Sequence, residues 1–247
     1  MKLIALETGR FEADLMQLAG IPGQALLPVP AWLIEHPRGL VLFDTGLHTK
    51  LRTPEGQMKG SFETTVVDFP VGEELTARIA AAGYSVADIQ TVIFSHLHFD
   101  HCGGTWEIPN AKIVVQESEW KAGHNPKLVE VGLYTPEDFD LGHDRLLIDG
   151  EHDLFGDGTI VCIPTPGHTR GHQSLLVRLA SGPVVLTSDC IYFATMYEQM
   201  RVPPFGADLT AQLASMRHLR ALEQQGCRLI FGHDAEQIRA LPIGGLS

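Results

Sequence analysis

The apolar residues of this chain gather in short runs that are separated by polar turns. Runs of this kind, rich in Val, Ile, Leu and Phe, are typical of buried β-strands. They predict strands over 3–7, 31–35, 40–44, 91–95, 112–116, 146–148, 159–163, 174–177, 184–188 and 228–232. The turn residues His36-Pro37-Arg38-Gly39 predict that the second and third of these strands pair as a hairpin.

A helical period replaces the short runs at two places. The first helix is expected over 72–82, with Leu75 and Ile79 on one face and Gly83 as C-cap. The second is expected over 208–225, with Asp208 as N-cap and an inner apolar stripe of Leu209, Leu213, Met216, Leu219 and Leu222. A short helix is expected over 117–123. Many strands with few helices predict two packed sheets that are covered by helices.

Three stretches lack either pattern and are expected to be loops: 8–28, 49–70 and 124–145. The first contains Gly20-Ile21-Pro22-Gly23 and is expected to be a mobile segment or loop. The second carries Met58, Phe62 and Phe69, which either contact an apolar ligand or fix the loop to the body of the protein.

Length and charge limit the kinds of partner. The 247 residues are enough for one large domain, expected over 1–247. The net charge of −12 disfavours nucleic acid and anionic membranes as partners. No apolar run is long enough to span a bilayer. We therefore expect neither nucleic acid nor a membrane as a partner, and the protein is expected to be a monomer or a homodimer.

The four cysteines, Cys102, Cys162, Cys190 and Cys227, form no CxxC pair. The opening residues are too short and too soon charged for a signal peptide. Both observations predict a cytoplasmic protein with free thiols and no structural zinc built on cysteine.

The densest chemistry lies in Ser95-His96-Leu97-His98-Phe99-Asp100-His101, directly after a predicted buried strand. Three histidines and an aspartate supply nitrogen and oxygen donors that suit Zn²⁺ or Fe²⁺. His96 and His98 can point the same way on extended backbone, whereas Asp100 and His101 can turn toward a second ion. Gly103-Gly104 then predicts a sharp turn.

Other predicted strands also end in a residue with a ligand-type side chain: Asp44, His168, Asp189 and His233. Taken singly, His168, Asp189 and His233 are weak signals, because a structural residue is the usual interpretation of each; their positions at strand ends strengthen them. A catalytic zinc takes about three protein ligands and keeps one position open. The seven donors His96, His98, Asp100, His101, His168, Asp189 and His233 therefore suit two ions that share a carboxylate. His48 either approaches such a site or lies on a solvated loop, and His124, His143, His152 and His218 are expected at the surface.

The stretch 95–104 matches the HxHxDH signature of the metallo-β-lactamase superfamily, and the later motifs match in order at Gly167-His168, Ser188-Asp189 and Gly232-His233. The chain resembles this superfamily over nearly its whole length. The resemblance implies an α+β fold, an αββα sandwich of two mixed β-sheets flanked by helices, with a dinuclear metal site between the sheets. By the same resemblance His96, His98 and His168 hold one ion, Asp100, His101 and His233 hold the other, and Asp189 bridges them.

Within the superfamily, the chain resembles the N-acyl-homoserine lactone lactonases, which destroy quorum-sensing signals. Phe99, the run 42–46, the run 167–175 and Tyr192 carry this likeness. It implies hydrolysis of the lactone ring by two divalent ions, with zinc as the default. It also implies that Phe99 and Tyr192 contact the substrate, that Tyr192 polarises the lactone carbonyl, and that Asp100 passes a proton to the leaving alkoxide. His172 either orients a metal ligand or is an ordinary hydrogen-bonded histidine.

Other functions use the same fold. A lactonase for another ring or a thioesterase of the glyoxalase II type would use the same metals. The acidic chain that ends soon after His233 argues against the thioesterase. A persulfide dioxygenase would hold a single iron with fewer protein ligands, and a metal-binding module without activity would have no need of Tyr192.

Overall fold

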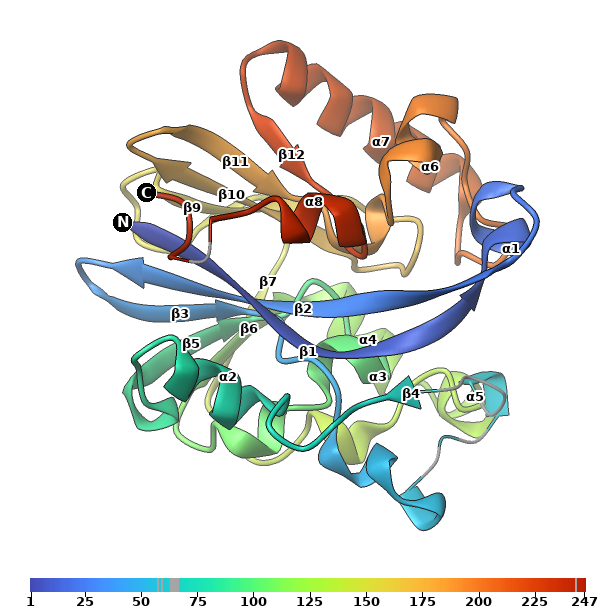
Figure 1. Cartoon of the computed structure of the whole chain (residues 1–247), viewed down its shortest axis with the longest axis horizontal. Coiled ribbons are helices and arrows are strands. Elements are labelled where there is room, and N and C mark those ends of the chain that lie inside the picture. The colour runs from blue at the N-terminus through green and yellow to red at the C-terminus, as the bar shows by residue number, and fades with distance from the viewer. Residues whose placement is uncertain (57, 59, 63–66, 243) are drawn as a thin grey trace.

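Two β-sheets pack face to face in the computed structural model of the chain, which describes residues 1–56, 58, 60–62, 67–242 and 244–247. Helices cover the outer face of each sheet, so that the order of layers is αββα (Figure 1). The two chain termini lie close together at one end of the sandwich (Figure 1).

The first sheet has the strand order β4-β1-β2-β3-β5-β6-β7 in the described part of the chain. The neighbouring pairs from β4 through β1 and β2 to β3 are antiparallel, and those from β3 through β5 and β6 to β7 are parallel. Its strands are β1 (Lys2–Asp14), β2 (Gln24–His36), β3 (Gly39–Phe43), β4 (Val67–Asp68), β5 (Ile89–Ile93), β6 (Lys112–Gln116) and β7 (Arg145–Ile148).

The second sheet has the order β12-β11-β10-β9-β8, and only its β11–β12 pair is parallel among the described residues. Both sheets are therefore mixed, as the family resemblance implied. The strands are β8 (His152–Asp153), β9 (Ile160–Pro164), β10 (Gln173–Leu179), β11 (Gly182–Leu186) and β12 (Arg228–Ile230).

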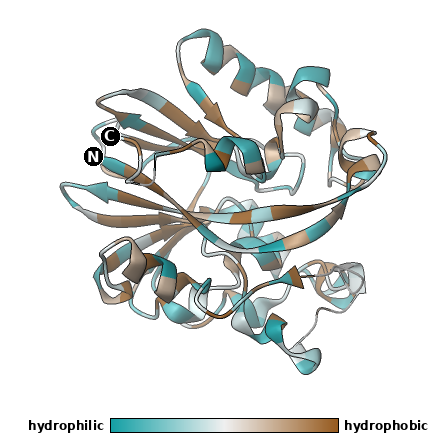
Figure 2. Ribbon diagram, viewed as in Figure 1, coloured by the Kyte–Doolittle hydropathy of each residue, from teal (hydrophilic) through white to brown (hydrophobic). Residues whose placement is uncertain are grey.

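The helices form two outer layers around these sheets (Figure 1). They are α1 (Leu15–Ala19), α2 (Leu75–Ala81), α3 (Phe99–Cys102), α4 (Glu117–Gly123), α5 (Pro126–Glu130), α6 (Ala194–Gln199), α7 (Leu209–Gln224) and α8 (Ala235–Arg239). Apolar residues colour the central strands brown, whereas α7 shows a largely hydrophilic outer side (Figure 2). None of the described helices combines the length and the apolar character that a bilayer crossing needs.

Three apolar layers hold the sandwich together. Leu75 and Ile79 of α2 pack under the first sheet, Phe43 and Leu175 meet between the sheets, and Met216 of α7 packs on the second sheet. Burying one such side chain stabilises the fold by about 1.5–3 kcal/mol. Apart from β1 and β2, which extend well beyond the predicted 3–7 and 31–35, the predicted strands and helices are confirmed within a few residues. Asp208 caps α7 by accepting a hydrogen bond from the Ala211 N–H at 2.9 Å.

The prediction of a loop over 8–28 is wrong. Those residues form the long ends of β1 and β2, joined through α1, and the two strands pair as far as Asp14 and Gln24. Pro28 and Pro30 fit into this half of β2, because it pairs with β1 alone and β3 begins its pairing only at Trp32. A strand with one neighbour tolerates proline.

The other two expected loops contain more structure than predicted. Residues 124–145 include α5. Residues 49–70 contain β4 and short 3₁₀ helices at Thr49–Arg52, Pro54–Gly56 and Gly60–Phe62. Phe69 is buried against Val29, Leu47, Leu51 and Phe99, with Met58 packed on the same cluster, so both residues fix the segment to the body. The side chain of Phe62 lies outside what the structure describes.

Candidate metal centre

The predicted donors meet at one edge of the sandwich, where strands of both sheets end. His96 and His98 follow β5 of the first sheet, whereas His168, Asp189 and His233 follow β9, β11 and β12 of the second. All seven predicted donors are buried, with exposed fractions of 8% or less. The centre therefore depends on the packing of the two sheets against each other.

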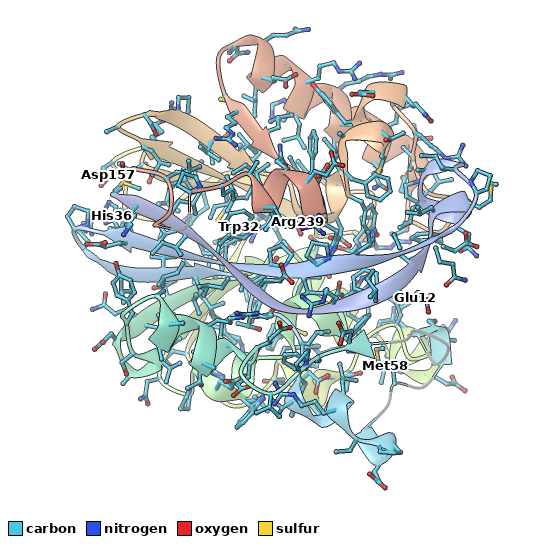
Figure 3. All side chains as sticks on the ribbon, in the orientation of Figure 1. Glu12, Trp32, His36, Met58, Asp157 and Arg239 are labelled. Carbon is cyan, nitrogen blue, oxygen red and sulfur yellow. The ribbon has the colours of Figure 1, made fainter. Side chains whose placement is uncertain are left out.

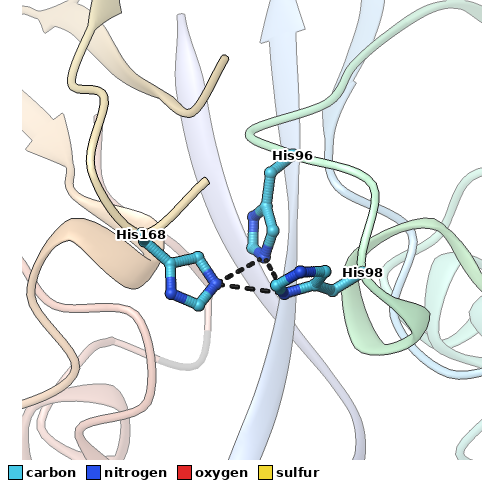
Figure 4. A group of neighbouring side chains, drawn as sticks. All are labelled: His96, His98 and His168. Atoms are coloured by element: carbon cyan, nitrogen blue, oxygen red, sulfur yellow. Dashed lines mark hydrogen bonds between the residues drawn. The ribbon is translucent and has the colours of Figure 1, made fainter. Parts of the chain in front are cut away.

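His96, His98 and His168 form the first donor group (Figure 4). The His96 Nε2, His98 Nδ1 and His168 Nε2 atoms lie 3.1 Å from one another in all three pairs. Tetrahedral zinc with Zn–N bonds of about 2.0–2.1 Å places its ligand atoms at roughly this spacing. Three ring nitrogens in mutual contact cannot all be hydrogen-bonded to one another, whereas one cation between them satisfies all three.

Asp100, His101 and His233 form the second donor group. The His101 Nε2 atom lies 3.4 Å from Asp100 Oδ2, and the His233 Nε2 atom lies 3.8 Å from the same oxygen. The Nδ1–H of His101 donates to Asp44 Oδ2 at 2.8 Å, and the Nδ1–H of His233 donates to the Pro28 carbonyl at 2.8 Å. These outer bonds select the tautomers that direct both Nε2 lone pairs into the centre.

Asp189 faces both groups, one oxygen to each. Its Oδ1 lies 3.2 Å from His101 Nε2 and 3.0 Å from His233 Nε2, whereas its Oδ2 lies 3.3 Å from His168 Nε2 and 3.9 Å from His96 Nε2. A carboxylate in this position can bind two neighbouring ions, one through each oxygen.

The chemistry of the donor set fits metal ions. Burial lowers the pKa of His98 to about 4 and that of His168 to about 3, so that both rings are neutral near pH 7 and can offer lone pairs. Burial would also lower the pKa of His101, but Asp100, Asp189 and Asp44 raise it well above its usual value. His101 Nε2 is buried and has no hydrogen-bond partner among the described residues, although it faces two carboxylates. A cation at this point would meet all of these demands.

Asp44 supports the centre from behind instead of contributing a ligand. It is buried with φ 61°, and accepts hydrogen bonds from the Ser95 N–H at 2.7 Å, the Ser95 hydroxyl at 2.8 Å and His101. The strand-end pattern correctly placed Asp44 near the centre. Its two oxygens are occupied by the bonds from Ser95 and from the outer nitrogen of His101, and it belongs to neither donor group.

Tyr192 lies beside both donor groups. Its ring stacks on His233 at 5.4 Å, and its oxygen lies 3.2 Å from His168 Nδ1, which donates to it in the tautomer that frees Nε2 for a metal. Burial raises the pKa of Tyr192 well above its usual value, and the charges of Asp189 and Asp100 add to the effect. The phenol therefore stays protonated near neutrality and can donate a hydrogen bond.

Three further histidines, His172, His48 and His143, lie outside the donor groups. His172 is buried, its Nδ1 lies 2.9 Å from the Thr165 hydroxyl, and its ring lies 5.2 Å from that of His96, outside both donor groups. His48 is half-buried and stacks on Trp106. His143 was expected at the surface, but is buried and donates to the Ile108 carbonyl at 3.0 Å, so that expectation is wrong.

A cavity of about 740 Å³ leads to the donor groups. Phe99, Asp100, Asp189 and Tyr192 line its inner end. Its outer walls come from the end of β1, from α1, from the α5 region and from the segment around Phe205. In Figure 1, α1 lies above α5 on the side of the molecule where these walls meet. Sequence reasoning missed the walls from β1 and α1, because that stretch was interpreted as a loop.

Comparison with known proteins decides the family. The sequence profile described as "Metallo-beta-lactamase superfamily" matches residues 25–225. The chain belongs to the metallo-beta-lactamase superfamily.

Similar members of the superfamily carry lactonase names. The "N-acyl homoserine lactonase AttM" of Azorhizobium caulinodans is 33% identical over 96% of this chain and 94% of its own length. The "N-acyl homoserine lactonase AiiA" of Bacillus thuringiensis subsp. kurstaki is 32% identical over 98% of this chain and 96% of its own. A solved N-acyl homoserine lactone hydrolase with N-hexanoyl-L-homoserine at its catalytic metal centre has a TM-score of 0.86 and 28% identity, over 98% of this chain and 96% of its own.

Proposed function

We propose that this protein is a dinuclear-metal hydrolase that opens the lactone ring of N-acyl-homoserine lactones to give N-acyl-homoserines. The observation that carries the proposal is the position of Asp189 between two buried donor groups at the inner end of a large cavity. The lactonase names of relatives that align with nearly the whole chain support it.

Two ions per chain would be held by these groups. His96, His98 and His168 would bind one, Asp100, His101 and His233 would bind the other, and Asp189 would bind both. Zinc is the expected metal, because buried histidines and carboxylates at this spacing suit tetrahedral coordination. When bound, such ions polarise an ester carbonyl and lower the pKa of water.

The surrounding residues would act on the ester itself. The Tyr192 phenol would donate a hydrogen bond to the lactone carbonyl oxygen, where negative charge develops during attack. Burial would raise the pKa of Asp100, but the charges of His101 and His233 lower it below its usual value, so that Asp100 is ionised near pH 7. An ionised Asp100 can take up a proton and deliver it to the alkoxide oxygen of the opened ring.

The acyl chain would occupy the outer part of the cavity. Phe99 is buried at the junction of the donor groups and the cavity, with Phe11 at 6.3 Å in an edge-on arrangement. Leu18, Leu128 and Leu133 continue the apolar lining toward the opening. We therefore place the lactone ring beside Phe99 and Tyr192, and the acyl tail along these leucines.

The charge and the cysteines of the chain bear on its partners and its location. We propose that residues 1–247 act as one domain, as a monomer or a homodimer, and that neither nucleic acid nor a membrane is a partner of this strongly acidic chain. The cysteines, all free, support a reducing location such as the cytoplasm.

The test follows proton release in a pH-stat, with zinc-loaded protein and acyl-homoserine lactones of short and long chain. Ring opening frees a carboxylic acid, so turnover is read directly. We expect fast turnover of the lactones and slow turnover of a glutathione thioester. A protein that binds two ions and cleaves only the thioester would show that its activity is that of a thioesterase and not of a lactonase.

A further inference from the structure

Glu119, in the first turn of α4, is a fully buried carboxylate outside both donor groups. It accepts four hydrogen bonds. Its Oε1 accepts from the Leu97 N–H at 3.1 Å and the Tyr134 hydroxyl at 3.0 Å, and its Oε2 accepts from the Thr169 hydroxyl at 2.7 Å and the Gly171 N–H at 3.0 Å. Acidic residues in the first turn of a helix are usually solvated, so the sequence gave no sign of this position.

Three of these bonds join the two loops that supply the first donor group, and the fourth comes from Tyr134, whose ring lies 5.3 Å from that of His98. Leu97 stands between His96 and His98 in the loop after β5, and Thr169 directly follows His168 in the loop after β9. These loops belong to different sheets. A single carboxylate thus links the two halves of the sandwich at the place where three histidine nitrogens must converge.

The second donor group has its own support. Asp44 binds Ser95 and His101, and the Pro28 carbonyl binds His233. Glu119 makes none of its four bonds to that group. Because a buried carboxylate is costly unless it is hydrogen-bonded, the four bonds that Glu119 accepts suit it to a positional role. We propose that Glu119 is a positioning residue for the metal ion held by His96, His98 and His168. The inference rests on the proposed dinuclear centre.

The substitution Glu119→Gln isolates this role, because glutamine has nearly the same shape. If the amide nitrogen replaces Oε2, the Gly171 N–H loses its acceptor, and if it replaces Oε1, the Leu97 N–H loses its acceptor. Either orientation leaves a buried backbone N–H unpaired and loosens one of the two loops.

Glu107 offers a matched control. It is also buried, and its Oε2 accepts from the Thr76 N–H at 2.8 Å, while its Oε1 has no hydrogen-bond partner among the described residues. Glutamine can keep the one bond by turning its oxygen toward Thr76. Glu107→Gln should therefore leave metal binding unchanged.

The experiment measures Zn²⁺ affinity of the metal-free protein by competition with a chromophoric chelator. We expect two tightly bound ions in the wild type and in Glu107→Gln. In Glu119→Gln we expect one ion to bind about 10- to 100-fold more weakly, with the other unchanged. The ion that still binds tightly to Glu119→Gln should be the one held by Asp100, His101 and His233. The double variant with His98→Ala should therefore keep this tight binding, whereas the double variant with His233→Ala should lose it. Wild-type affinity for both ions, or equal loss of both, would overturn the inference.

A gentler variant covers the case in which Glu119→Gln does not fold. Thr169→Val removes one of the four bonds and should weaken the same ion to a smaller extent, whereas Thr169→Ser keeps the hydroxyl and should restore it. Unchanged zinc affinity in Thr169→Val would then overturn the inference. A wild type that binds fewer than two ions overturns the dinuclear centre and the inference together. A wild type that binds two ions without cleaving lactones refutes only the activity, and the result with Glu119→Gln still decides the role of Glu119.

Discussion

Asp189 places one carboxylate oxygen against each donor group, with its Oδ1 3.0 Å from His233 Nε2 and its Oδ2 3.3 Å from His168 Nε2. Asp189→Asn replaces one oxygen with an amide nitrogen that cannot bind a cation. We expect loss of both ions or of most activity, as measured by metal analysis and lactone turnover. A fully active variant with two metals would show that Asp189 does not bridge.

Tyr192 offers a separate test, because it lies outside both donor groups and its hydroxyl is 3.2 Å from His168 Nδ1. Tyr192→Phe should keep the metal content and raise the activation free energy by about 1–3 kcal/mol, which slows turnover about 5- to 150-fold. Steady-state kinetics on a protein with verified metal content measures this. An unchanged kcat would remove Tyr192 from the mechanism.

Residues of the centre differ in how well the sequence predicts them. His96, His98, Asp100 and His101 stand in one short motif, so spacing alone brought them together. The structure also places His168, Asp189 and His233 with them. Glu119 was not predicted, because its hydrogen-bond partners Leu97, Tyr134, Thr169 and Gly171 come from separate segments that only the tertiary fold brings together.

At the scale of elements, the turn after α3 shows how a loop of ligands is fixed. Gly103-Gly104 was expected to allow a sharp turn, but Gly103 has φ −62° and Gly104 has φ −85°, which any residue can adopt. Glycine is needed for close packing instead: a Cβ on Gly103 would lie 2.3 Å from the His48 N, and one on Gly104 would lie 2.3 Å from the Thr45 carbonyl oxygen.

Gly103→Ala should therefore destabilise the protein by about 1–3 kcal/mol, because the atoms it meets are backbone and cannot move aside easily. Denaturant unfolding measures the loss. Gly244→Ala is the matched control, since no atom of the described residues lies within 4 Å of the position that its Cβ would take. It should change the free energy of unfolding by less than about 0.5 kcal/mol. Equal stabilities of the two variants would refute the packing argument.

The prediction of elements succeeded where strands are buried on both faces, as in β5, β6 and β11. It failed over 8–28, because β1 and β2 run beyond the body of the sheet and lose a regular burial pattern there. Those strand ends form a wall of the cavity, so the same error hid the outer part of the substrate site.

On the scale of the whole molecule, the sheets are also joined at the end opposite the cavity, where Figure 3 labels His36 and Asp157. His36 Nδ1 accepts from the Arg38 N–H at 3.1 Å, its Nε2 lies 3.1 Å from the Thr159 hydroxyl, and its ring stacks on Phe155 at 4.2 Å. Burial lowers the pKa of His36, although Asp157 partly opposes the effect. This junction is therefore built for a neutral imidazole.

The folded protein resists protonation of His36, whereas the unfolded chain does not. The neutral His36 ring therefore contributes stability above its pKa in the unfolded chain, about 6.5, and this stability is lost as the pH falls toward its lower pKa in the folded protein. Between pH 7 and pH 5 the wild type should lose more unfolding free energy than His36→Gln in the same metal state, by at most about 1.4 kcal/mol per pH unit. Urea unfolding at several pH values measures this difference. Parallel pH profiles for the two proteins would contradict it.

The two sheets of the whole molecule bring together seven donors, and we propose that these hold two ions for lactone hydrolysis. The most direct test adds Zn²⁺ stepwise to the metal-free protein and measures hydrolysis of N-hexanoyl-homoserine lactone at each step. We expect the rate to reach its full value only when two ions are bound per chain. A full rate with one ion, or no hydrolysis with two ions bound, would contradict it.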